Sequence, residues 1–186
     1  MTSKLLKHYE INKPLKAFHA RNEHSAVVRH IEALQAGHDL AMVSDAGTPG
    51  ISDPGFLLIR AAREANLDLT VLPGATAIIP ALVGSGFPSD RFYFEGFLPV
   101  KKGRQTRLKY LATLDQTIIL YVSPHKLLKD LNALAEYLGP NRQACVVKEI
   151  SKIYETFDQA SLEELHINWQ EKTIKGEFVL VISPQK

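Results

Sequence analysis

One stretch, residues 39–55 with the sequence DLAMVSDAGTPGISDPG, constrains the fold of this chain most strongly. Its first five residues, 39–43, are mostly apolar and predict a buried strand. A polar turn follows, and Asp53 with Pro54 then predicts the amino-terminal cap and first position of a helix. Glycine lets a ligand approach the backbone, and proline holds that backbone in one shape. A rigid loop after a strand is where α/β folds bind ligands, although an ordinary connection has the same order.

The first half of the chain alternates between strand and helix patterns. This order implies a mostly parallel sheet with helices packed on both faces. Turn residues cluster around Pro88, so we expect an amino-terminal domain of residues 1–88 and a carboxy-terminal domain of residues 89–186. The patterns predict helices at 2–8, 23–36, 56–65 and 75–83, and strands at 14–18, 39–43 and 69–72.

The second half predicts a mixed sheet with its own helices. Two of its strands, 143–150 and 153–157, are so close in sequence that they must form an antiparallel hairpin. Ser161 followed by Glu164 predicts a capping box for the next helix. The other strands are expected at 91–95, 117–122 and 177–182, and the helices at 104–114, 123–138 and 161–172. The expected fold class is therefore α/β in two domains.

The composition of the chain does not indicate a function, but it excludes several kinds of site and partner. The 186 residues carry a net charge of +2, so a nucleic-acid partner must be inferred from local clusters. A single cysteine, Cys145, excludes an intrachain disulfide and fits a core position in a reducing cytoplasm. The seven histidines show no metal-binding spacing, so no metal site is predicted. The sequence has no apolar run of the ~18 to 20 residues that cross a bilayer, and we expect no membrane partner.

A second loop of small residues, LPGATA at 72–77, resembles the first in its position between a strand and a helix. Two such loops on neighbouring parallel strands would converge at one end of the sheet and share a ligand. Neither loop has the GxxxxGK[ST] or GxGxxG pattern of a nucleotide phosphate site. A ligand held by backbone polar groups and a close apolar wall is favoured instead.

Two groups in the second half could carry chemistry. Five positive charges lie between residues 101 and 109, and most precede or begin a helix, where cations oppose the helix dipole. They form either a solvated face or a site for a polyanion such as RNA. Lys148 with Glu149 and Tyr154 with Glu155 are either cross-strand pairs or proton-transfer groups.

Six ordered segments of the chain resemble the ribosomal RNA small subunit methyltransferase I family, within the tetrapyrrole methylase superfamily. The segments are SDAGTPGISDPG (44–55), LPGATA (72–77), GFPSDRFYFEGFLP (86–99), SPHK (123–126), KEISKIYET (148–156) and KGEFVLVI (175–182). The resemblance covers residues 1–183 and implies two α/β domains with S-adenosylmethionine between them. It also implies methylation of the 2′-hydroxyl of a cytidine in small-subunit ribosomal RNA.

The resemblance assigns residues to the cofactor and to RNA. It implies that the cofactor contacts Ala46, Gly47, Thr48, Pro49, Gly50, Ile51, Gly74, Ala75, Thr76, Ala77, Tyr121, Val122 and Gly176. It implies that ribosomal RNA, free or in the small subunit, faces Arg91, Lys101, Lys102, Arg104, Arg107, His125 and Lys126. The methyl group of a sulfonium is already activated for transfer. The enzyme needs to align it with the ribose oxygen and to supply a base that accepts the proton of the 2′-hydroxyl. The catalytic candidates are Glu149 and Glu155, with Lys148 or Lys152 assisting by its charge.

Two departures from the family pattern matter. Family members begin with a strand and a PTPIGN-like turn, whereas this chain starts at TSKLLKHY, and Val122 stands where the family more often has an acidic residue. A missing strand would leave an unpaired edge, so a homodimer or low stability is expected. Two alternatives stay open: a methylase acting on a tetrapyrrole precursor, and a shortened, non-catalytic fragment that binds RNA.

Overall fold

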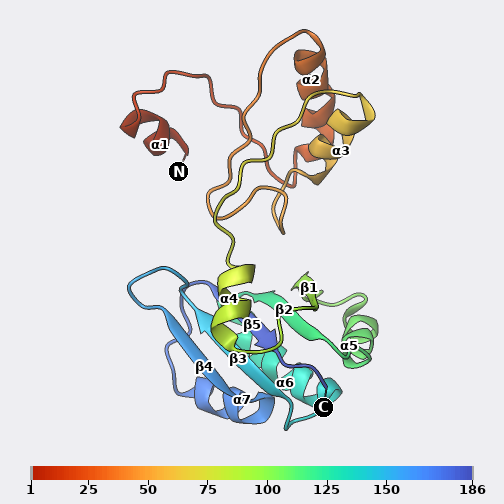
Figure 1. The fold of residues 1–186 in the computed structure, drawn as a ribbon, viewed down its shortest axis with the longest axis vertical. Helices are drawn as coiled ribbons and strands as arrows, with labels where there is room; N and C mark the ends of the chain where they lie inside the picture. The colour runs from red at the N-terminus through yellow and green to blue at the C-terminus, as the bar shows by residue number, and fades with distance from the viewer. Residues whose placement is uncertain (1, 186) are drawn as a thin grey trace. The chain divides into compact units, whose positions relative to one another are not determined.

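The computed structural model describes residues 2–185 and divides the chain into two compact units between Thr76 and Ala77 (Figure 1). The outer limits of the two predicted domains, residues 1 and 186, lie outside the described part. The division falls ahead of the predicted boundary at residue 88 because α4 (Ile78–Ser85) belongs to the second unit. Ile78, Ala81 and Leu82 of this helix are buried against strands of that unit.

The first unit is helical in its described residues. Its helices are α1 (Thr2–His8), α2 (Glu23–Gln35) and α3 (Phe56–Glu64), close to the predicted limits. α2 packs against α3, and the buried apolar side chains of this unit are those of Ala26 and Ala62. This core is small because alanine side chains remove little apolar area from water.

The strands predicted at 14–18, 39–43 and 69–72 are not formed, which corrects the expected parallel sheet of the first unit. Residues 2–76 contain no assigned strand. A strand exists only through hydrogen bonds to a neighbour, and the described residues of these segments make no such ladder. Their apolar side chains are exposed as a result, with Val71 at 67% and Leu72 at 77%.

The second unit contains a five-stranded mixed sheet in the order β1-β2-β5-β3-β4, which confirms the predicted mixed sheet and the α/β class. β1 and β2 are parallel, and the remaining neighbours are antiparallel. The strands are β1 (Phe92–Phe97), β2 (Thr117–Val122), β3 (Gln143–Lys148), β4 (Thr156–Ser161) and β5 (Phe178–Ile182). The helices besides α4 are α5 (Arg104–Ala112), the 3₁₀ turn η1 (Pro124–Lys126), α6 (Leu127–Leu138) and α7 (Leu162–Gln170).

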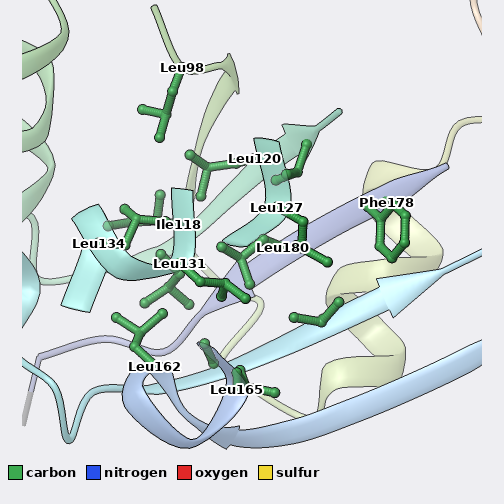
Figure 2. Packing of buried hydrophobic residues seen from close by; sticks show 14 of the residues in the cluster. Leu98, Ile118, Leu120, Leu127, Leu131, Leu134, Leu162, Leu165, Phe178 and Leu180 are labelled. Atoms are coloured by element: carbon green, nitrogen blue, oxygen red, sulfur yellow. The ribbon is translucent and has the colours of Figure 1, made fainter. Parts of the chain in front are cut away.

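Alternate residues of β2, β3 and β5 enter two different cores, as the two-residue period of a strand requires. Ile118, Leu120 and Leu180 pack with leucines of α6 and α7 on one face (Figure 2). Leu108 and Leu111 of α5 belong to the same core. Ile119 and Cys145 pack under α4 on the other face. Cys145 is therefore the core residue that the sequence indicated, and burial raises the pKa of its thiol to about 11.

The hairpin formed by β3 and β4 is antiparallel as predicted, but its second strand begins at Thr156 and not at residue 153. The residues between the strands form an irregular loop in which Glu149 and Ser151 have left-handed φ angles of 55° and 62°. The capping box is confirmed, because the Ser161 hydroxyl accepts from the Glu164 amide and the Glu164 carboxylate accepts from the Ser161 amide.

Candidate active site and nucleic-acid interface

The loop after residue 43 is closed by its own side chains. The Ser44 hydroxyl donates to the Ala46 carbonyl at 3.0 Å and to the Asp53 carboxylate. Asp53 is therefore not the cap of α3, which corrects that prediction. The cap is Gly55, and its amide and the Leu57 amide donate to Glu23 Oε1 of α2 at 2.9 and 3.1 Å. An acceptor from another helix thus satisfies the free amides at the start of α3.

The two loops of small residues contact each other, although the described residues do not form the parallel strands that were expected to bring them together. The Thr48 hydroxyl donates to the Ala75 carbonyl at 3.0 Å. A Cβ atom added to Gly47 would lie 3.7 Å from the same carbonyl oxygen, so a side chain there would touch the second loop. The residues from Ala46 to Ile51 and from Gly74 to Ala77 are exposed or half-buried, which leaves backbone groups of both loops open to a ligand.

The predicted site residues of the second unit converge through strand order. Phe97 pairs with Tyr121, Val122 pairs with Phe178, and Phe178 pairs with Lys148. Lys148 pairs in turn with Thr156. The carboxyl ends of β1, β2 and β3 and the amino ends of β5 and β4 therefore lie at one end of the sheet, which we call the site end (Figure 1).

Four of the predicted RNA contacts lie at the site end. Lys101 and Lys102 follow β1, and His125 and Lys126 follow β2. Because β1 and β2 are parallel neighbours, their following loops leave the sheet on the same side. The side chains of Lys101, Lys102 and His125 are exposed, and that of Lys126 is half-buried.

The other three predicted RNA contacts have different surroundings. Arg91 precedes β1 at the opposite end of the sheet, where it lies 3.7 Å from Asp90. Arg107 donates to both Glu95 carboxylate oxygens at 2.6 and 2.8 Å and to the Tyr93 hydroxyl at 2.6 Å. Arg104 is buried and pairs with Asp130 at 2.6 Å. A direct RNA contact by Arg104 is therefore corrected to a structural role.

Two predicted cofactor contacts, Tyr121 and Val122, end β2. The Tyr121 ring lies edge-on to Phe94 with centroids 5.1 Å apart and is half-buried. Val122 is only 3% exposed and packs in the core under the helices. Its side chain cannot wall a ligand, which corrects that expectation, and only its backbone remains available for a contact.

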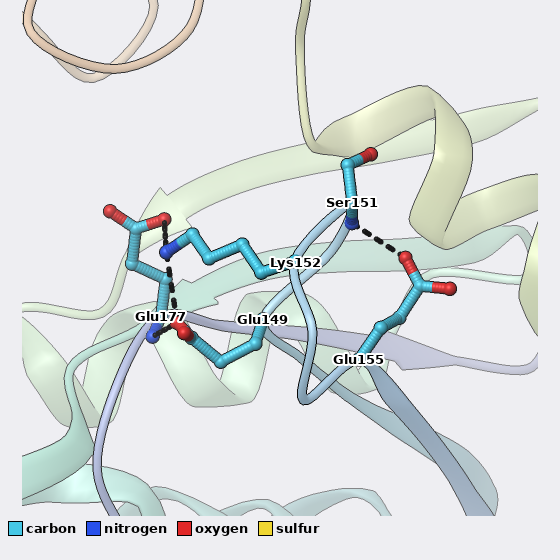
Figure 3. Close-up of polar contacts among 5 residues, drawn as sticks. All are labelled: Glu149, Ser151, Lys152, Glu155 and Glu177. Carbon is cyan, nitrogen blue, oxygen red and sulfur yellow. Dashed lines mark hydrogen bonds and ion pairs between the residues drawn. The ribbon is translucent and has the colours of Figure 1, made fainter.

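Two of the catalytic candidates, Glu149 and Glu155, lie on the loop between β3 and β4 at the site end (Figure 3). Glu149 Oε1 accepts from Lys152 Nζ at 2.9 Å and from the Glu177 amide at 2.8 Å. The Lys152 hydrogen bond, followed by the Glu177 amide, lowers the pKa of Glu149. Lys152 also donates to Glu177 Oε2 at 2.9 Å, and these two carboxylates raise its pKa. Glu149 is thus held ionised and is a weaker proton acceptor than a free carboxylate.

The catalytic candidates Glu155 and Lys148 flank this network. Glu155 Oε2 accepts from the Ser151 amide at 2.6 Å, which closes the loop between β3 and β4. Lys148 Nζ donates to the Thr173 carbonyl at 3.3 Å and lies 6.0 Å from the centre of the Trp169 ring. The structure therefore brings Glu149 and Glu155 onto one loop and directs the Lys148 amine toward Trp169.

Several partners in these sites had no local signal in the sequence. Glu177 approaches Glu149, Asp130 pairs with Arg104, and Glu23 caps α3. Each pair joins residues distant in sequence, so no helical or strand spacing connects them. The Glu149–Lys152 spacing of three residues was the one local indication.

Gly176, the last predicted cofactor contact, is required by the loop itself. It has a φ of 99°, and a Cβ atom there would lie 2.5 Å from Glu149 Oε1. We expect Gly176→Ala to lower the free energy of unfolding by ~1–3 kcal/mol, because it adds backbone strain and displaces Glu149. Urea denaturation measures this change.

Gly103→Ala is the matched control for that variant. Gly103 has a similar φ of 81°, but a Cβ atom there would meet nothing within 4 Å. Gly103→Ala should therefore lower the free energy of unfolding by the backbone strain alone. Equal losses for the two variants would show that the contact between residue 176 and Glu149 has no effect on stability.

Among the described residues, no group of three or more metal-ligating side chains is arranged to hold an ion. The helices of residues 2–185 include none with the length and apolarity needed to cross a membrane.

The chain belongs to the tetrapyrrole (corrin/porphyrin) methylases, because residues 2–166 match the model of that family. Within it, the chain belongs to the ribosomal RNA small subunit methyltransferase I family. It is 47% identical over 183 residues to the Synechocystis protein of that name, covering 98% of this chain and 66% of the relative. It is also 47% identical over 184 residues to the Xylella fastidiosa protein, covering 97% and 67%. The chain thus spans about two thirds of the length of these curated relatives.

Solved structures support the fold. The methyltransferase CobJ superposes with a TM-score of 0.63 at 20% identity, covering 87% of this chain and 71% of that one. Uroporphyrin-III C-methyl transferase from Thermus thermophilus, complexed with S-adenyl homocysteine, superposes with a TM-score of 0.56 at 18% identity, covering 86% and 71%. At these identities the likeness defines the fold and not the substrate.

Proposed function

We propose that this chain carries out S-adenosylmethionine-dependent methylation of a cytidine 2′-hydroxyl in small-subunit ribosomal RNA. The observation that carries the proposal is the placement of two basic loops, with Lys101, Lys102, His125 and Lys126, at the same end of the sheet as Glu149 and Glu155. Cations bind the RNA backbone and set its register. Carboxylates nearby can accept the hydroxyl proton.

The cofactor is assigned to the paired small-residue loops. Thr48 and Ala75 hold the loops together, and the exposed backbone around Gly47 and Gly74 offers polar groups without bulky side chains. The relatives at 47% identity are named methyltransferases, and a structure of the same fold is described with S-adenyl homocysteine. S-adenosylmethionine supplies an activated methyl group, so the protein needs mainly to align the acceptor oxygen.

The chemical roles divide between the two glutamates. Glu149 organises the loop because Lys152 and the Glu177 amide already occupy its Oε1 atom. We assign the role of proton acceptor to Glu155, whose Oε2 atom accepts a hydrogen bond from the Ser151 amide. Lys148 is assigned the positive charge that favours the deprotonated ribose oxygen, a role that requires its amine to leave the Thr173 carbonyl.

Transfer of tritiated methyl groups from S-adenosylmethionine to small ribosomal subunits tests this function. After digestion to nucleosides, label is expected in 2′-O-methylcytidine. We expect Glu155→Gln to lower kcat by at least about 100-fold with little change in the KM for RNA, as loss of a general base does. Glu149→Gln should alter stability as well, because it releases Lys152. Normal rates for Glu155→Gln and Lys148→Ala would contradict these roles.

The alternative substrate is a tetrapyrrole precursor, as the family name suggests. Label transferred to a porphyrinoid acid, with none in RNA, would favour it over the proposal. The proposal places the protein in the cytoplasm with its ribosomal partner. It also includes a homodimer, since a second copy could cover exposed apolar residues such as Val71 and Leu72.

A further inference from the structure

Arg104 is the buried member of the basic cluster at residues 101–109, whose three lysines are exposed. Its side chain is 10% exposed and that of Asp130 is 5% exposed. Arg104 Nη2 donates to Asp130 Oδ1 at 2.6 Å, and Nη1 donates to the Pro99 carbonyl at 3.2 Å. One guanidinium therefore bridges a carboxylate and a backbone oxygen through two of its nitrogens.

The two partners of Arg104 belong to the two basic loops of the site end. Pro99 lies in the loop after β1, two residues before Lys101. Asp130 lies in the first turn of α6, which continues the η1 turn that contains His125 and Lys126. The bridge through Arg104 thus ties the loop after β1 to the segment after β2.

The pair contributes more to geometry than to stability. Burial raises the pKa of Asp130, and the Arg104 hydrogen bond and charge oppose that shift. Desolvation offsets most of the attraction between buried charges, so apolar residues of similar volume often replace such pairs with little loss. The planar guanidinium, in contrast, fixes two acceptors in a defined arrangement, which an apolar pair cannot do.

We propose that Arg104 is a positioning residue for RNA binding, which holds the Lys101–Lys102 loop and the His125–Lys126 turn at a fixed spacing. The inference rests on the proposed function. A loop ordered before binding gives tighter binding than one that must be ordered by the RNA. Arg104 itself is buried and donates to Asp130 and to the Pro99 carbonyl, so the proposal assigns it no phosphate contact.

The test measures binding of a short fluorescein-labelled single-stranded RNA across a range of salt concentrations. The double variant Arg104→Met/Asp130→Leu removes the bridge without changing the net charge. We expect it to bind RNA about 10-fold more weakly, the order expected when two long side chains are no longer ordered beforehand. The slope of log K against log salt should stay unchanged, because no phosphate contact is lost.

Two reference variants define the scale. Lys101→Ala/Lys102→Ala should weaken binding and make the slope less negative by about 1.4, since each phosphate contact on a single strand contributes ~0.7. Lys109→Ala removes an exposed charge in the last turn of α5, away from the site end, and should bind like the wild type. Thermal unfolding of every variant establishes that it is folded.

The outcomes separate the inference from the function on which it rests. If the Lys101→Ala/Lys102→Ala variant binds weakly but the Arg104→Met/Asp130→Leu variant binds like the wild type, the positioning role is wrong and the RNA interface stands. A slope that is less negative by about 0.7 in the bridge variant would mean that a direct phosphate contact was lost and would also overturn positioning. Unchanged RNA binding by both variants would show that the RNA-binding site does not lie at this end of the sheet.

Discussion

The amide hydrogens of residues 39–43 and 69–72 are expected to exchange with solvent at least about 1,000-fold faster than those in the centres of β2, β3 and β5. Exchange from a strand in a packed core requires opening that approaches the global free energy of unfolding, ~5–15 kcal/mol. Residues 39–43 and 69–72 form no ladder in the described part of the chain. Their exchange therefore requires almost no opening.

The difference in core size gives the same expectation. Ile119, Leu120, Val146 and Leu180 of the second unit are fully buried. The buried apolar side chains of residues 2–76 are those of alanines. Hydrogen exchange followed by mass spectrometry resolves these segments, with the peptide over β3 as the internal control. Equal protection of residues 39–43 and β3 would mean that the first unit forms a sheet in solution.

Trp169→Ala should lower the free energy of unfolding of the second unit by ~3–5 kcal/mol, the typical loss for a buried aromatic side chain. Trp169 is 2% exposed, and its ring lies edge-on to Phe178 with centroids 5.4 Å apart. Phe178 begins β5 at the site end, between Val122 and Lys148. The cavity would therefore open directly beneath the candidate active site, and urea denaturation monitored by circular dichroism measures the loss.

Trp169→Phe is the matched control for the alanine variant. It keeps an aromatic ring against Phe178 and removes the indole N–H, which is buried without a hydrogen-bond partner. We expect its loss to be less than half that of Trp169→Ala, because removing an unsatisfied donor offsets part of the lost volume. Comparable losses for the two variants would show that the ring contact with Phe178 is not the source of stability.

The sequence predicted the second unit closely because its signals were local and mutually consistent. The run TIILYV predicted β2 at 117–122, and Ser161 with Glu164 predicted the cap of α7. The first unit was predicted less well because strands 39–43 and 69–72 depend on partners that a local pattern does not contain. An apolar segment indicates a need for burial, but it does not supply the neighbouring strand.

The candidate site divides in the same way. The exposed positions of Lys101, Lys102 and His125 follow from polar loops after predicted strands. The burial of Arg104 does not, because its partner Asp130 is distant in sequence. Val122 shows a related limit: it ends a strand at the right place, but the two-residue period directs its side chain into the core. Sequence predicted which residues follow the strand ends, whereas contacts distant in sequence decide which of their side chains face outward.

Hydrogen exchange of the chain with and without S-adenosylmethionine tests the pairing of the two small-residue loops most directly. If Thr48 and Ala75 mark one binding site, the cofactor should slow exchange of peptides covering residues 46–51 and 74–77 together. Thr48→Val, which removes the hydroxyl that joins the loops, should weaken both effects in parallel. Protection of only one loop, or of neither at saturating cofactor, would contradict a shared methyl-donor site.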